Sequence, residues 1–179
     1  MLDERERMTR NHTFALPIAR MVLRALVALN WAYAASILVL ILMPHEQWIM
    51  RYFELSPGPR ADRMVAGLRI IAVLGLVAVP LNHAILRRLV AIVETVRDGN
   101  PFVSDNADRL RTTAWSLLAL QVLSTLIGQI AKALSTSQTP VHLSTGFSVA
   151  GWLAVLLTFI LAAVFREGTK MRDELAGIL

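Results

Sequence analysis

The sequence predicts an all-α integral membrane protein, a four-helix bundle with cytoplasmic N- and C-termini. Of its 179 residues, 55% are hydrophobic and 17% are charged, against about 25% charged in an average soluble protein. Mean hydropathy is +0.54. Four long stretches carry no charge, and Lys and Arg are unevenly distributed between the segments that join them. These observations exclude an ordinary soluble enzyme and a disordered chain.

Four uncharged stretches are long enough to cross a bilayer: residues 25–43, 70–86, 112–131 and 146–165. A helix rises about 1.5 Å per residue and the hydrocarbon core is about 30 Å thick, so about 20 residues span it. The second stretch is short, but Arg69, Arg87 and Arg88 can extend their charged ends to the interfaces. Four buried helices of a soluble protein are the alternative, but a chain of this length cannot surround them. The expected parts are a cytoplasmic N-terminal segment (1–24), a four-span transmembrane domain (25–165) and a cytoplasmic tail (166–179).

The placement of Lys and Arg predicts the orientation in the membrane. The segments before residue 25, from 87 to 111 and after 165 hold 13 of the 18 Lys and Arg residues. Because basic residues concentrate in cytoplasmic loops, we expect a bacterial inner-membrane protein with both termini in the cytoplasm. Residues 1–10 mix acidic and basic side chains, and no small-residue cleavage site follows a short apolar run, so no cleavable signal peptide is expected. The net charge of +5 reflects this asymmetry and attraction to anionic lipid in the bilayer. Direct nucleic-acid binding is not expected, since no binding motif accompanies the charge.

The first outer loop is expected to form a short interfacial helix within residues 45–55. Its apolar residues share one side of that helix: Trp48, Ile49, Tyr52 and Phe53. Aromatic residues of this kind lie at the depth of the lipid headgroups. A Ser-Pro-Gly-Pro run at 56–59 ends the helix. We interpret the loop as a connector that lies on the membrane, and a ligand lid is the alternative.

The second apolar helix is predicted to bend at Pro80, because proline removes a backbone hydrogen bond. It continues beyond the membrane along residues 87–98, where apolar residues recur every three or four positions, and Gly99 ends it. Polar and small residues share one face of the third apolar helix: Gln121, Ser124, Thr125, Gly128 and Lys132. Such a stripe normally faces neighbouring helices. The charged tail with spaced apolar residues predicts a short cytoplasmic helix.

Two segments carry a resemblance to a known family. Residues 99–102 read Gly-Asn-Pro-Phe and precede Asn106 and an Arg-Leu-Arg run, while residues 165–168 read Phe-Arg-Glu-Gly and precede Met-Arg-Asp-Glu-Leu. With the four apolar segments, from about residue 25 to the end, they resemble the bacterial membrane family named domain of unknown function 2975. The resemblance implies a four-helix inner-membrane protein with no assigned chemistry. It also implies a helix-turn-helix regulator as a partner, because members are often encoded beside a small Cro-type one.

No catalytic residue, metal site or cofactor is predicted, and we expect no enzyme. The four histidines are His12, His45, His83 and His142, and none has a second histidine at metal-ligand spacing. His45 and His142 both fall in outer loops, so a joint metal or pH-sensing site is the alternative to solvated histidines. No Asp or Glu lies within the four stretches, which argues against a proton relay. Cysteine is absent, which excludes disulfides and thiolate chemistry.

Four polar residues are expected at similar depth within the membrane: Asn30, Asn82, His83 and Ser116. Polar groups in lipid need partners, so these side chains should face the interior of the bundle. The pattern indicates hydrogen bonds between helices, each contributing about 0.6 kcal/mol. A ligand or ion pocket is the alternative interpretation of this polar layer.

The cytoplasmic segments contain a candidate docking surface for a soluble protein: Phe102, Arg109, Arg111, Met171, Arg172 and Leu175. An apolar centre with an arginine-bearing rim is typical of a protein interface. The alternative is that the loop and the tail pack on each other and on the membrane. The expected function is therefore a regulatory or interaction protein that docks a soluble partner such as a helix-turn-helix regulator. An accessory subunit of a membrane complex, or a small transporter component, is the alternative, and a homo-oligomer is compatible with either.

Overall fold

Long α-helices make up most of the computed structural model. It describes residues 2–42, 46–52, 56–99, 101–135 and 146–176, and within them it contains no strand. The helices are α1 (Leu2–Leu42), α2 (Glu46–Tyr52), α3 (Pro59–Arg97), α4 (Ser104–Leu134) and α5 (Val149–Ala176). Four segments are long and apolar enough to cross a membrane: Ile18–Leu42, Pro59–Arg97, Ser104–Leu134 and Val149–Glu174. The predicted all-α class with four candidate spans is confirmed, and it indicates a multi-pass membrane protein.

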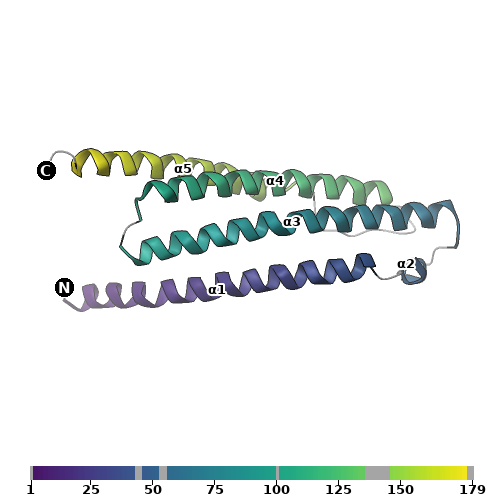
Figure 1. Ribbon diagram of the computed structural model, residues 1–179, viewed down its shortest axis with the longest axis horizontal. Coiled ribbons are helices and arrows are strands. Elements are labelled where there is room, and N and C mark those ends of the chain that lie inside the picture. Colours follow the sequence, from purple (N-terminus) through teal and green to yellow (C-terminus); the bar gives the residue numbers. More distant parts are fainter. Residues whose placement is uncertain (1, 43–45, 53–55, 100, 136–145, 177–179) are drawn as a thin grey trace.

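The four long helices form a row in chain order. α1 packs against α3, α3 against α4, and α4 against α5, while α2 contacts α3. Among the described residues α1 and α5 do not meet, so the bundle expected from the sequence is not closed. Lipid covers an apolar helix as well as protein does, and nothing therefore forces the two edge helices together. Both chain ends and the α3–α4 connection lie at the same end of the row (Figure 1). We call this part, residues 18–24, 88–111 and 166–176, the terminal end.

The ends of α2 and α3 follow local sequence signals, and the outer ends of α1 and α5 differ from the expectation. The short helix expected within 45–55 is α2, and α3 ends at Arg97 with Gly99 at a φ of 76°, as expected of a glycine after a helix. α3 is continuous through Pro80. α1 begins at Leu2 and α5 runs on to Ala176, so the N-terminal segment and the tail extend the spans instead of forming separate elements. Gly168 inside α5 does not interrupt the helix.

Glycines bring the helices of the row into close contact. A Cβ atom added to Gly67 of α3 would collide with Leu134 of α4, and one added to Gly151 of α5 would collide with Gln121 of α4. A Cβ at Gly75 would lie 3.3 Å from Ile37 Cδ1 of α1. Small residues allow such backbone approach, which supports association of helices in lipid.

The polar stripe expected on the third apolar helix faces its neighbours over most of its length. Gln121 and Gly128 are buried, and the Ser124 hydroxyl lies 3.4 Å from the backbone nitrogen of Gly146, just before α5. Lys132, at the end of the stripe, is exposed. The stripe therefore belongs mainly to the packing of α4.

Candidate functional site

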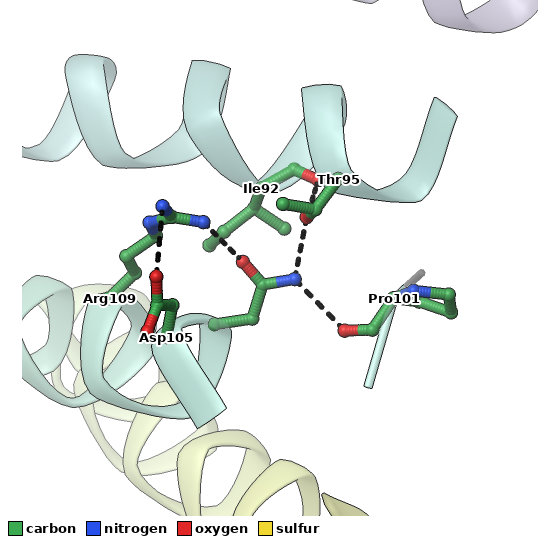
Figure 2. Close-up of polar contacts among 6 residues, drawn as sticks. Ile92, Thr95, Pro101, Asp105 and Arg109 are labelled. Atoms are coloured by element: carbon green, nitrogen blue, oxygen red, sulfur yellow. Dashed lines mark hydrogen bonds and ion pairs between the residues drawn. The ribbon is translucent and has the colours of Figure 1, made fainter. Parts of the chain in front are cut away.

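The α3–α4 connection is held by one buried side chain, the amide of Asn106 (Figure 2). Asn106 Nδ2 donates to Thr95 Oγ1 at 2.6 Å and to the Pro101 carbonyl at 2.9 Å. Asn106 Oδ1 accepts from Arg109 Nη1 at 2.9 Å. Arg109 also lies 3.7 Å from the Asp105 carboxylate. Both ends of the amide are thus paired, and together they tie the end of α3, the connection and the start of α4 into one unit.

A second set of contacts ties this connection to α5. The Phe102 ring packs at a centroid distance of 5.4 Å from the Phe165 ring. A Cβ atom on Gly168 would lie 3.2 Å from the Phe102 ring, so only glycine leaves that ring its full space. Arg172 Nη1 donates to the Phe102 carbonyl at 2.9 Å. We call the residues in these two sets of contacts the clasp: Thr95, Pro101, Phe102, Asp105, Asn106, Arg109, Phe165, Gly168 and Arg172.

The structure distributes the docking candidates between the clasp and the surface. Phe102 and Met171 remain 43% and 56% exposed, and Arg111 is exposed. Arg109 does not form part of a rim, because Asn106 and Asp105 hold its guanidinium against α4. Arg172 is exposed but bonded to the connection. The side chain of Leu175 lies outside the described residues. The loop and the tail do pack on each other, and they leave Phe102 and Met171 partly uncovered.

Only two residues of the expected polar layer meet at one interface, that of α1 and α3. Asn30 Nδ2 donates to the Val79 carbonyl at 3.2 Å, and the His83 ring packs edge-on against Trp31 at a centroid distance of 5.5 Å. His83 Nδ1 is buried and has no hydrogen-bond partner in the described part of the chain.

The other two residues of that layer are placed elsewhere. Ser116 is buried, but its hydroxyl donates to the Thr112 carbonyl of its own helix at 2.9 Å. Asn82 is exposed, so the expectation that it faces inward is wrong. Successive helical residues are about 100° apart, and the packing of His83 toward α1 turns Asn82 away from that contact.

Sequence reasoning placed no special role on Asn106, which the structure makes the centre of the clasp. A signal was present, because Asn106 lies within the first of the two family-like segments. The ion pair between Arg20 of α1 and Glu94 of α3, at 3.0 Å, was also not expected. No group of three His, Cys, Asp or Glu side chains suited to a metal occurs in the described ranges. His45 and His142 lie outside those ranges.

Comparison with known proteins gives one match. The model of a family described as "Protein of unknown function (DUF2975)" matches residues 50–177. The chain belongs to this family. The match contains α3, α4, α5 and the whole clasp, and it begins within α2, so it does not include α1. No curated protein and no solved structure matches the chain.

Proposed function

We propose that this DUF2975 member is an inner-membrane regulatory protein that docks a soluble protein at its terminal end. One observation carries the proposal: Phe102 and Met171 are 43% and 56% exposed at a place beyond the apolar part of α5. Met171 lies six residues beyond Phe165, the last residue of the uncharged stretch, and exposed apolar groups outside the membrane are typical of binding surfaces. The clasp holds the connection that bears Phe102 against α5, so the two residues form one preorganised surface.

The partner that we propose is a small helix-turn-helix regulator. The support is the family itself, since its members are often encoded beside such a gene. The surface can accommodate regulators with different apolar side chains, because the side chain of Met171 is flexible and adapts to different contacts. The alternative of a transporter component has less support, because Gln121 and Gly128 are buried and Ser124 contacts the segment before α5.

The proposal requires the terminal end to lie in the cytoplasm, as the excess of Lys and Arg at that end supports. Reporter fusions after Leu179 and at Asp98 should then read cytoplasmic, and fusions at Ser56 and Ser137 should read periplasmic. A periplasmic C-terminus beside a cytoplasmic N-terminus would contradict the four-span arrangement, because an even number of spans keeps both ends on one side.

Docking is tested with the full chain in lipid nanodiscs and the small helix-turn-helix regulator that we propose as its partner. Met171→Ser should weaken binding about tenfold, the effect of a modest interface residue, and biolayer interferometry measures it. Lys170→Ala changes an exposed neighbouring side chain and serves as the matched control. Unchanged binding by Met171→Ser would remove the support for docking at this surface.

The variants Phe102→Ala and Leu175→Ala extend the test. Phe102→Ala should reduce both binding and folded protein, because the Phe102 ring also packs on Phe165. Leu175→Ala should reduce binding and leave membrane insertion intact. If both variants insert normally and retain the partner, the surface lies elsewhere.

A further inference from the structure

Arg88 is a basic residue of α3 that neither the clasp nor the docking surface uses. It lies seven residues before Thr95 and 21 residues, a multiple of seven, after Gly67. Seven residues make about two helical turns, so the three positions follow one side of α3. Both flanking positions contact α4, Thr95 through a hydrogen bond and Gly67 through close packing. Arg88 therefore lies on the side of α3 that faces α4.

The residue of α4 that lies opposite Arg88 follows from the antiparallel pairing of α3 and α4. Thr95 is bonded to Asn106, and seven residues farther along each helix Arg88 comes opposite Thr113. Thr113 is 3% exposed, and its hydroxyl donates to the Arg109 carbonyl at 2.8 Å. Arg88 thus emerges beside a well-packed part of the α3–α4 interface.

The guanidinium of Arg88 contains a buried atom that the described part of the chain leaves unpaired. Its Nη1 atom is buried and has no hydrogen-bond partner among the described residues. Two carboxylates of the terminal end are engaged elsewhere, Glu94 with Arg20 at 3.0 Å and Asp105 with Arg109 at 3.7 Å. A buried N–H of a charged group is costly when it is unpaired. An acceptor supplied from outside the described residues would remove this cost.

The position of Arg88 along the helix indicates where that acceptor comes from. Residues 70–86 of α3 carry no charge, and at about 1.5 Å per residue they cover about 26 Å of a hydrocarbon core of about 30 Å. Arg88 follows two residues later, at the depth of the headgroup phosphates. A planar guanidinium pairs with a phosphate through two parallel hydrogen bonds.

We propose that Arg88 binds the phosphate of an anionic phospholipid, such as phosphatidylglycerol, at the edge of the α3–α4 interface. The neighbouring Arg87 is exposed and adds only general attraction for anionic lipid. The site is independent of the docking function, since it uses neither Phe102 nor Met171.

Native mass spectrometry of the full-length, delipidated protein tests the site, with phosphatidylglycerol and phosphatidylcholine titrated separately. Wild type should prefer phosphatidylglycerol. Arg88→Gln should weaken phosphatidylglycerol binding about tenfold, the effect of a charged hydrogen bond, while Arg87→Gln should weaken it less. Equal loss in both variants, or no preference in wild type, overturns the proposal.

A second arm separates lipid phosphate from soluble phosphate. Inorganic phosphate added to the wild type with phosphatidylcholine should neither bind nor raise the unfolding temperature; if it does so as phosphatidylglycerol does, the ligand is a soluble phosphate and the lipid assignment is wrong. If Arg88→Gln fails to fold, Arg88→Lys replaces it, because lysine keeps the charge but offers no planar pair of donors. A reduced preference for phosphatidylglycerol in Arg88→Lys supports the site, and an unchanged one overturns it.

Discussion

Polar side chains behave differently in the spans and at the terminal end. In the spans, the hydroxyls of Ser116, Thr125 and Thr158 donate to the carbonyl four residues earlier in their own helix. At the terminal end, polar groups join separate segments: Asn106 links α4 to α3, and Arg172 links α5 to the α3–α4 connection. Two contacts within the spans are exceptions. The Asn30 bond to Val79 joins α1 to α3, and the contact of Ser124 with Gly146 joins α4 to the segment before α5.

The difference shows which forces hold each region. A hydroxyl that donates to its own helix keeps that hydrogen bond whichever helix packs beside it. Such a hydroxyl therefore does not determine which helices associate. Association of the spans therefore rests on close packing at Gly67, Gly75 and Gly151. The terminal end rests on directional bonds between segments. Loss of one polar group should lower the free energy of unfolding most at the terminal end. Added side-chain volume should lower it most in the spans.

The largest effect is expected from Asn106→Ala. This change removes one buried amide and the three hydrogen bonds that it makes with Thr95, the Pro101 carbonyl and Arg109, at a cost of about 3 kcal/mol. The loss in the free energy of unfolding is measured by unfolding the protein in mixed detergent micelles. Asn82→Ala removes the same side chain from an exposed position and should change it by less than about 0.5 kcal/mol. Similar losses in the two variants would erase the distinction between the regions.

A smaller effect is expected from added volume between two spans. Gly151→Leu places a side chain where Gln121 lies, and overpacking of this kind costs about 2 kcal/mol. Ala154→Leu adds comparable volume at an exposed position of α5 and should be nearly neutral. The same unfolding assay applies. A neutral Gly151→Leu would show that α4 and α5 are not closely packed at this point.

The smallest effect is expected from Asn30→Leu, which removes the hydrogen bond to Val79 at a cost of about 0.6 kcal/mol. Adding Asn82→Leu should give strictly additive losses, because Asn82 is exposed and the amide of Asn30 is bonded to Val79. A double-mutant cycle measures the sum. Strong coupling between the two positions would restore the polar layer that the sequence suggested.

The sequence alone determined the number of candidate spans, the helix end before Gly99 and the short helix before the Ser-Pro-Gly-Pro run. These are local properties. Hydropathy, segment length and the conformational range of glycine and proline act within about 20 residues of chain, whatever the neighbouring segments do.

Only the tertiary structure decided the row of helices, the inward turn of Arg109 and the outward turn of Asn82. Each depends on how a helix is rotated against a partner, and a rotation of about 100° separates adjacent residues. The clasp depends further on segments far apart in the chain, since Arg172 reaches the carbonyl of Phe102 across 70 residues. A motif can mark such residues, as it did Asn106, but their partners are known only when the helices are brought side by side.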